Sequence, residues 1–334
     1  MRILLVRNDK LGDFMLAWPS LALLKKALPA AHVGVLVPAY TAPMAEICPW
    51  VDEVVLDPGA EAGGRVLRQQ LGVFRADALL TLYSTPRVGY AAWRVGIPYR
   101  LAPASKLAQV FYNRRLVQRR SRSEKPEWEY NLDLVRCFLA DHDLSAGKTV
   151  PPYLVFPTDE IATLRARFMQ AQGIDEDALL LLIHPGSGGS ANNLTLDQYA
   201  QLARDLAAAR PLHIVIGYGP GEDAQAATLS SLLEPLPHSL LYPGSLVDYA
   251  RHIAFANLFI SGSTGPLHLA GALDVPTAGF YPRRRSATPL RWQTLNSPQR
   301  HLAFVPEDGA DESDMSRIDL KTAAQAIRQK LLAG

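Results

Sequence analysis

A carboxylate placed where an apolar strand turns into a helix is the first residue in this sequence that could do chemistry. The stretch NDKLGD, residues 8–13, follows the apolar run RILLV (2–6) and ends on Asp13. At such a place a carboxylate can take the proton of a hydroxyl group as a general base. The competing interpretation is structural, because an aspartate also caps the N-terminus of a helix. The position alone does not choose between these two interpretations of Asp13.

Three glycine-bearing loops in the second half of the chain could bind phosphate. They are HPGSGGSANN (184–193), GYGPGED (217–223) and SGSTGPLHLAGAL (261–273), and each follows an apolar strand signal. Exposed backbone N–H groups at a helix start favour an anion, although any one of these loops could be an ordinary turn. Together they predict a nucleoside diphosphate site. The candidate residues are Ser187, Gly188, Gly189, Asn192, Gly217, Ser263, Thr264, Gly265 and His268.

Charge is distributed unevenly along the chain. Residues 1–150 hold 20 Lys/Arg and 14 Asp/Glu, whereas residues 151–334 hold 14 and 18, so a net charge of +2 divides into +6 and −4. The segment NRRLVQRRSRSEK (113–125) concentrates this positive charge. It predicts an anionic partner for the first half, unless the run is merely a solvated face. Few aromatic residues interleave with the cations, which argues against a nucleic-acid partner.

Alternating strand and helix signals position these loops. The strand signals RILLV, VGVLV, EVVL and ALLTL occupy 2–6, 33–37, 53–56 and 78–82, and a helical pattern runs from Phe14 to Leu28. A proline-rich stretch follows, and the alternation then restarts with strand signals at 179–184, 212–217, 239–244, 258–262 and 276–281. This pattern predicts an α/β protein of two doubly wound domains with parallel sheets. In such folds ligands bind at the carboxyl ends of the strands.

The same pattern predicts the domain boundaries. We expect a first domain at 1–150, a linker at 151–160 and a second domain at 161–316. Residues 317–334 should form a C-terminal helix that packs back on the first domain.

Several other classes of protein are disfavoured. GYGPGED is not the G-x-G-x-x-G of a nicotinamide-binding loop, and no G-x-x-x-x-G-K-[ST] occurs. S-x-S-x-G around Ser263 only approaches a hydrolase nucleophile elbow. The eight histidines and two cysteines lack metal-ligand spacing, so no metal site is expected. With neither a signal peptide nor a long apolar run, the chain is predicted to be cytoplasmic, without a transmembrane segment.

Four stretches together resemble glycosyltransferase family 9, the ADP-heptose:lipopolysaccharide heptosyltransferases. They are ILLVRNDKLGD, IHPGSG, YPGSLVDYARHIAFANLFISG and STGPLHLAGALDVPTAGFY. EWEYNLDLVRCFL (127–139) also looks like the helix that precedes the domain linker in this family. The similarity runs over most of the chain, and the last of the four stretches is quite specific.

The resemblance implies a GT-B fold, in which two Rossmann-like domains face each other across a cleft. The N-terminal domain would bind the acceptor and the C-terminal domain the sugar nucleotide. The implied reaction is an inverting, metal-independent transfer of heptose from ADP-heptose to the inner core of lipopolysaccharide. The resemblance is also what implies a catalytic role for Asp13, which would be the base, and no cofactor would be needed beyond the donor substrate. A helix N-terminus would favour the ionised form of Asp13 and make it a weak base.

The acceptor implied by the resemblance carries phosphates and Kdo carboxylates at the inner face of the cytoplasmic membrane. The chain would then be cytoplasmic and peripheral to that surface. Cations of the first domain would bind this acceptor. The candidates are Lys10, Arg114, Arg115, Arg119 and Arg120.

The sequence also departs from the family pattern. Asn192 stands where the family often has the lysine of K-x-W, and Ser263 replaces the aspartate of D-T-G. The run Arg283–Arg285 could restore the positive charge at the diphosphate, or it could be a solvated surface run. These departures leave two alternatives open. One is a family 9 transferase with another sugar nucleotide or acceptor, and the other is a non-catalytic protein that binds a nucleotide or a glycan.

Overall fold

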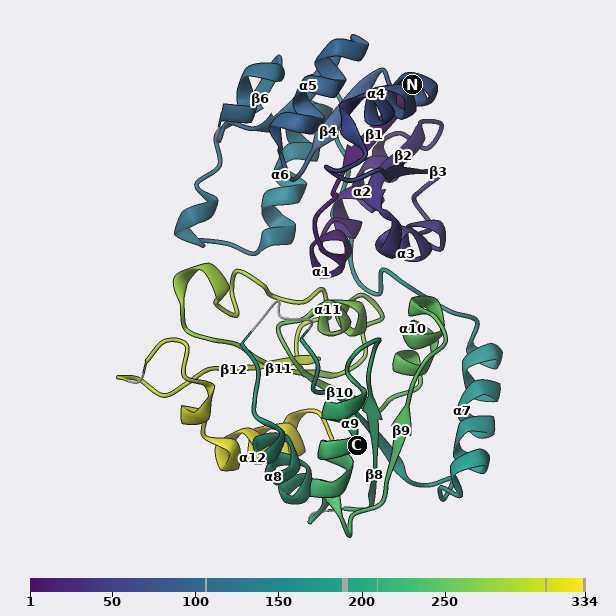
Figure 1. Cartoon of the computed structure of the whole chain (residues 1–334), viewed down its shortest axis with the longest axis vertical. Coiled ribbons are helices and arrows are strands. Elements are labelled where there is room, and N and C mark those ends of the chain that lie inside the picture. The colour runs from purple at the N-terminus through teal and green to yellow at the C-terminus, as the bar shows by residue number, and fades with distance from the viewer. Residues whose placement is uncertain (106, 188–191, 209, 310, 333–334) are drawn as a thin grey trace. The chain divides into compact units, whose positions relative to one another are not determined.

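We describe a computed structural model of the chain, which covers residues 1–105, 107–187, 192–208, 210–309 and 311–332. The chain divides into two compact units, residues 1–150 and 151–334 (Figure 1). Each unit is built on its own six-stranded parallel sheet, so the predicted α/β class with two doubly wound domains is confirmed. None of the helices in the described ranges combines the length and the apolar character needed to cross a membrane.

The first unit alternates strands with helices from its first residues onward. Apolar strands come first, and helices return the chain to the next strand. Its elements are β1 (Arg2–Val6), α1 (Leu11–Met15), α2 (Trp18–Ala27), β2 (His32–Pro38), η1 (Ala39–Thr41), α3 (Ala42–Glu46), β3 (Glu53–Asp57), α4 (Gly63–Phe74), β4 (Ala78–Thr81), α5 (Pro86–Val95), β5 (Tyr99–Pro103), η2 (Leu107–Phe111), β6 (Arg114–Leu116), η3 (Arg120–Arg122) and α6 (Glu127–Ala140).

The second unit repeats this alternation. It begins with a helix that packs beside α10. Its elements are α7 (Thr158–Gln172), β7 (Leu179–His184), α8 (Leu196–Ala207), β8 (Leu212–Gly217), α9 (Asp223–Leu233), β9 (His238–Leu241), α10 (Leu246–Ala254), β10 (Leu258–Gly262), α11 (Gly265–Ala272), β11 (Thr277–Phe280), η4 (Arg285–Ala287), β12 (His301–Phe304), η5 (Met315–Arg317) and α12 (Leu320–Lys330).

Both sheets have the same topology. The strand order is β3-β2-β1-β4-β5-β6 in the first unit and β12-β11-β10-β7-β8-β9 in the second. In each sheet the order reverses beside the unit's first strand, between β1 and β4 and between β7 and β10. The carboxyl ends of these strand pairs open the crevice in which doubly wound sheets bind ligands. The loops after β1, β4, β7 and β10 are therefore the places to look for a site.

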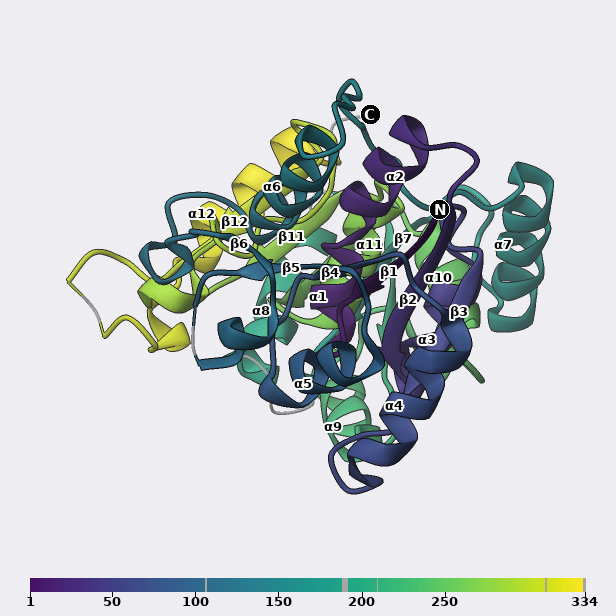
Figure 2. The same ribbon diagram turned by 90° about the horizontal axis from the view of Figure 1, so that it is seen from above.

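Helices cover both faces of the first sheet. Seen from above in Figure 2, α4 and α5 lie on one side of the strands and α2 and α6 on the other. Apolar side chains of β1, β4 and α4, such as Leu4, Leu79 and Leu71, form one buried core with α5 and η2. The helix layers hold the central strands β1, β2 and β4 in place, because these strands are buried on both faces.

Three predictions of the elements are corrected. The helix predicted from Phe14 to Leu28 is two helices, because α2 restarts at Trp18 with a proline in its first turn. The predicted linker 151–160 overlaps α7, which begins at Thr158. The strands β5, β6 and β12 carry polar residues and gave no apolar run from which to predict them.

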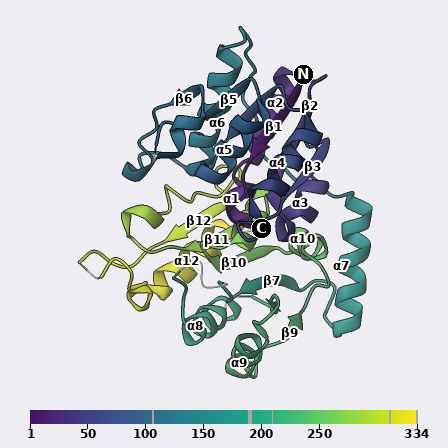
Figure 3. The ribbon, with the colours of Figure 1, turned by 45° about the horizontal axis from the view of Figure 1, so that its top comes forward.

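The C-terminal helix also differs from its prediction. The sequence assigned it to the first domain, but α12 belongs to the second unit and lies beside α8 (Figure 3). Its residues Ala323, Ala324 and Ile327 are buried in the second unit's core. The Arg328 side chain donates a hydrogen bond to the carbonyl of Asp205 in α8 at 3.3 Å. The apolar face of α12 is thus buried within the second unit.

Candidate functional site

A buried arginine organises the carboxyl end of β1. Arg7 directly follows the strand and is only 2% exposed. Its Nε donates to Asp9 Oδ1 at 2.9 Å, its Nη1 donates to Glu127 Oε1 at 2.9 Å, and its Nη2 donates to Asp13 Oδ1. Asn131 accepts a further bond from Nη1 at 3.2 Å. One guanidinium therefore joins the loop after β1 to the first turns of α6. We call Arg7, Asp9, Asp13, Glu127 and Asn131 the Arg7 hub.

Asp13 lies in the first turn of α1, where it is buried. Lys10 is the N-cap residue, and the Asp13 carboxylate bonds Arg7 rather than the helix backbone. Burial, together with the nearby charges of Asp9 and Glu127, raises the pKa of Asp13 to about 6 against the attraction of Arg7. The expectation that a helix N-terminus would make Asp13 a weak base is therefore wrong. Loss of hydration outweighs the ion pair with Arg7.

Glu127 connects the hub to the basic segment. Its side chain is 1% exposed and accepts a bond from Arg120 Nη1 at 2.7 Å as well as from Arg7. Arg120 also donates to the Leu82 carbonyl at 3.1 Å, in the loop after β4. The structure thus brings Asp13 and Arg120, two predicted site residues, to the same edge of the sheet. They are joined by two residues that the sequence analysis did not select.

The other predicted cations of the first unit are distributed differently. Lys10, Arg115 and Arg119 are exposed. Arg114 is bound through two hydrogen bonds to Asp141, at 2.6 and 2.7 Å, where α6 ends. The Arg7 hub contacts the opposite, N-terminal end of this helix. Arg114 is therefore not brought together with Asp13, and its part in acceptor binding stays a prediction.

In the second unit, a carboxylate lies against the loop after β7. Glu222 accepts a bond from the backbone N–H of Gly219 at 2.8 Å and lies 3.5 Å from the His184 ring at the end of β7. The approach is so close that a Cβ added at Gly186 would lie 2.0 Å from Glu222 Oε1. A side chain at position 186 would require the Glu222 carboxylate to move, because the loop backbone and the carboxylate share one small space.

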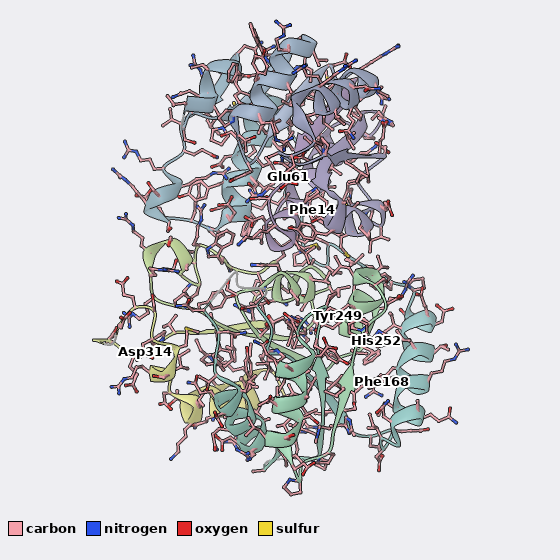
Figure 4. The ribbon with its side chains drawn as sticks, viewed as in Figure 1. Phe14, Glu61, Phe168, Tyr249, His252 and Asp314 are labelled. Atoms are coloured by element: carbon pink, nitrogen blue, oxygen red, sulfur yellow. The ribbon has the colours of Figure 1, made fainter. Side chains whose placement is uncertain are left out.

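Behind this carboxylate lies a buried ring pair. The Tyr249 hydroxyl is 2.8 Å from His184 Nδ1, and it occupies the space where a side chain at Gly217 would project. Figure 4 labels Tyr249 on α10, with His252 nearer to Phe168 of α7. Burial lowers the pKa of His184 and keeps its ring neutral. The buried groups next to the Glu222 carboxylate, the His184 ring and the Tyr249 hydroxyl that contacts it, are thus neutral.

The loop after β10 presents hydroxyl groups and a second neutral histidine. Ser261 Oγ, near the end of β10, donates to the carbonyl of His184 at the end of β7 at 2.9 Å and lies 3.0 Å from Thr264 Oγ1 in the loop. The loop after β10 is thus held to the end of β7 through Ser261. Gly265 begins α11, and His268 is buried one turn inside it, with Nδ1 lacking a hydrogen-bond partner among the described residues. Burial, reinforced by His301, lowers the pKa of His268 to about 3. An imidazole in this state can donate a hydrogen bond without bringing charge.

The remaining predicted donor residues are placed as follows. Gly188 and Gly189 lie outside the described residues. Ser187 and Ser263 are partly buried, in the loops after β7 and β10 respectively. Asn192 donates from its side chain to the Ser313 carbonyl at 3.1 Å. In the arginine run, Arg283 forms an ion pair with Asp308 of the acidic loop, so its charge is already balanced within the chain.

Sequence reasoning missed five residues of these two edges: Arg7, Glu127, Glu222, His184 and Tyr249. The signal for Glu222 was available, because it follows a strand in the glycine-bearing loop 217–223. Nothing in the sequence could pair Arg7 with Glu127, because 120 positions separate them. The described residues contain no group of three His, Cys, Asp or Glu side chains arranged to hold a metal ion.

Two doubly wound units with polar loops at both switch points define the class of the molecule as a GT-B fold. Solved structures over the whole chain agree. A family 9 glycosyltransferase from Veillonella parvula superposes with a TM-score of 0.81 at 17% identity, covering 100% of this chain and 97% of that one. An E. coli heptosyltransferase solved with ADP gives 0.75 at 18% identity, covering 99% and 100%. At these identities the likeness concerns the fold alone.

The chain belongs to glycosyltransferase family 9: the family model described as glycosyltransferase family 9 (heptosyltransferase) matches residues 65–317. A Haemophilus influenzae protein, whose name gives glycosyltransferase activity as an assumption, is 45% identical over 94% of this chain and 92% of its own. Lipopolysaccharide heptosyltransferase 2 of Salmonella typhimurium is 24% identical over 84% of this chain and 82% of its own. The predicted family is confirmed, and the chain is a glycosyltransferase related to the lipopolysaccharide heptosyltransferases.

Proposed function

We propose that this chain transfers a heptose from ADP-heptose to an acceptor of the lipopolysaccharide inner core, with inversion and without a metal ion. The first unit would bind the acceptor and the second the donor. The observation that carries the proposal is the buried Asp13, fixed by Arg7 at the switch point of the first sheet. The names of two similar proteins support this choice of substrates. One relative is a lipopolysaccharide heptosyltransferase, and one structural neighbour is a heptosyltransferase solved with ADP.

Asp13 would act as the general base. With a pKa of about 6 it is mostly ionised at neutral pH, yet it binds a proton more tightly than an ordinary aspartate. The acceptor oxygen forms a bond to the anomeric carbon while its proton passes to Asp13. The bond from that carbon to the diphosphate oxygen breaks, and its electron pair leaves with ADP. Attack opposite the leaving group inverts the configuration.

The second unit would bind the donor without added positive charge. Backbone N–H groups at the start of α11 and the neutral His268 can meet the diphosphate as it gains charge. In Rossmann-like units, an acidic residue often accepts hydrogen bonds from ribose hydroxyls. Glu222, beside the loop after β7, has this chemistry.

A second candidate function is transfer of another sugar, or transfer to another acceptor, by the same machinery. Two observations favour it. Asn192 offers no charge to a diphosphate and its amide is bound to the Ser313 carbonyl. Ser263 is likewise neutral where the family pattern has an aspartate. These positions would tune donor choice without changing the base in the first unit.

The experiment compares Asp13→Asn with the wild type in two assays. One measures transfer from ADP-heptose to a heptose-deficient lipid A acceptor, and the other measures binding of ADP, UDP and GDP by calorimetry. Asparagine keeps the shape of Asp13 but cannot take the proton, so transfer should fall by about 10²–10⁴-fold. ADP affinity should stay unchanged, because the donor binds in the other unit.

The outcomes separate the candidates. Equal turnover by the two proteins would remove Asp13 as base. If UDP or GDP binds more tightly than ADP while Asp13→Asn still abolishes transfer from the matching donor, the second candidate function holds. Asp205→Asn, a substitution on α8 of the second unit, serves as the matched control and should leave both assays unaffected.

A further inference from the structure

Helix α5 carries an exposed aromatic stripe on the first unit. Val88, Ala91 and Ala92 face the core, whereas Tyr90 and Trp93 are 40% and 50% exposed. Positions three and four apart share a helix face, so these two rings and the exposed Arg94 form one outward stripe. A contiguous exposed apolar patch, rather than a single exposed ring, is the informative observation.

The neighbouring η2 extends this stripe. Leu107 and Val110 are 86% and 69% exposed, and residues three apart eclipse each other in a 3₁₀ helix. Phe111 links the two elements, because its ring centroid lies 5.6 Å from that of Tyr90 and 6.2 Å from that of Trp93. Figures 1 and 3 show α5 close to β6, the strand that follows η2. We call Tyr90, Trp93, Leu107, Val110 and Phe111 the α5–η2 patch.

The patch is held as a rigid surface. A Cβ added at Gly89 would lie 2.9 Å from Tyr112 Cε2 and 3.1 Å from Phe111 Cβ, so α5 and η2 pack backbone against ring. Thr85 caps the start of α5 by accepting a bond from the Val88 N–H, and Gly96 ends it in the left-handed conformation. The exposed side chains therefore project from a fixed frame.

Two exposed arginines accompany the patch. Residues 78–123 contain nine Lys/Arg and no Asp or Glu. Arg94 lies on the exposed stripe of α5, and Arg115 is exposed on β6. Arg115 pairs in register with Ala102, a member of the core that α5 and η2 cover, so its side chain lies on the same face of the sheet as the patch. Arg87, Arg114, Arg120 and Arg122 of this segment form ion pairs with acidic residues outside it. Among the described residues, Arg94 and Arg115 have no such acidic partner.

We propose that the α5–η2 patch docks this protein on an anionic lipid bilayer. Tryptophan and tyrosine rings suit the headgroup level of a membrane, and leucine and valine side chains can enter its apolar boundary. Neighbouring arginines gain from the negative surface potential of anionic lipids. A protein partner would need acidic groups matched to each arginine, whereas a bilayer supplies negative charge over the whole face. Arg94 and Arg115, exposed on the same face as the aromatic rings, therefore favour the lipid surface.

The test uses the purified full chain and vesicles that contain no acceptor, so its failure is distinct from failure of the proposed transferase function. Flotation compares vesicles of phosphatidylglycerol and phosphatidylcholine with vesicles of phosphatidylcholine alone. The wild type should float with the anionic vesicles and be released by salt, because exposed charges are screened. The apolar variant is Trp93→Ser with Leu107→Ser, and the charge variant is Arg94→Glu with Arg115→Glu.

Matched controls carry the same changes on other exposed positions. Val73→Ser with Leu290→Ser controls the apolar variant, and Arg65→Glu with Arg167→Glu controls the charge variant. The charge variant should lose about 30-fold in partitioning and the apolar variant about tenfold, whereas the controls bind as the wild type does. Thermal melting verifies that each variant is folded, and a variant that melts early is replaced by Trp93→Gln alone.

Three results would overturn the proposal. The first is a wild type that does not distinguish anionic from neutral vesicles. The second is a pair of patch variants that partition as their controls do. The third is a wild type that self-associates without lipid, by analytical ultracentrifugation, and becomes monomeric in the patch variants. That last result would assign the patch to contact between copies of the chain.

Discussion

The carboxyl edges of the two sheets handle charge in opposite ways. In the first unit the buried groups are charged: Arg7 forms ion pairs with both Asp13 and Glu127. In the second unit, the buried groups at the equivalent edge are His184, Tyr249 and His268, and burial keeps them neutral. Two sheets with the same strand order thus carry two different electrostatic designs.

This difference matches the tasks that transfer would divide between the units. A base must gain a proton during the reaction, so it needs a pKa close to the working pH and a partner that holds it in place. A diphosphate brings its own charge, and neutral donors can stabilise that charge without a competing titration. In the proposed reaction, the charged groups of the first unit would serve proton transfer, and the neutral groups of the second would serve the leaving diphosphate.

The largest effect should come from breaking the charged design. Arg7→Met leaves Glu127, Asp9 and Asp13 without their shared cation, and removing one partner of a buried ion pair costs about 3–5 kcal/mol of unfolding free energy. Urea unfolding followed by tryptophan fluorescence measures it. The signal reports mainly on the first unit, which holds four of the five tryptophans: Trp18, Trp50, Trp93 and Trp128.

A second substitution sharpens that result. Adding Glu127→Gln to Arg7→Met removes the carboxylate that is 1% exposed, and part of the lost stability should return. If Arg7→Met unfolds at the wild-type urea concentration, the Arg7 hub is not a balanced charge cluster. The comparison with the second unit then loses its basis.

The next effect is on pH dependence. Because Asp13 must be ionised to take a proton and its pKa is about 6, kcat/KM should fall about tenfold per pH unit below that value. Asp9→Asn removes a like charge that raises the pKa of Asp13, so the acid limb should move to lower pH. Initial rates across pH for both proteins measure it. A limb that stays in place in Asp9→Asn would assign the titration to another group.

The smallest effect concerns the neutral design of the second unit. His268, with a pKa of about 3, does not titrate between about pH 5 and pH 8. Affinity for ADP-ribose, whose doubly esterified diphosphate keeps its charge, should therefore be flat across that range. His268→Leu should weaken it about tenfold, since a hydrogen bond to a charged group is lost.

His252→Leu is the control for this prediction. That histidine packs beside Phe168 of α7, with ring centroids 6.0 Å apart, and should leave the affinity unchanged (Figure 4). An ADP-ribose affinity that rises steeply toward pH 5 would instead show a titrating cation at the donor site. The second unit would then resemble the first in its electrostatics.

Much of this fold follows from apolar runs alone. The buried strands β1, β7 and β8 lie where RILLV, LLLLIH and LHIVIG predict them, because strands covered on both faces must be apolar throughout. Edge strands such as β6, with the sequence RRL, are half in solvent and carry no such signal. The position of Asp13 at a strand-to-helix turn was equally visible in the sequence, whereas its raised pKa was not.

The sequence by itself determined the class, the family and the loops at the strand ends, because local apolar periodicity and short motifs are written in consecutive residues. Only the tertiary structure decided the charge states at those ends. Arg7 donates a hydrogen bond to Glu127, which is 120 positions away, and Glu222 packs against Gly186 in the loop of a neighbouring strand. Burial and proximity set a pKa, and both depend on residues that are distant along the chain.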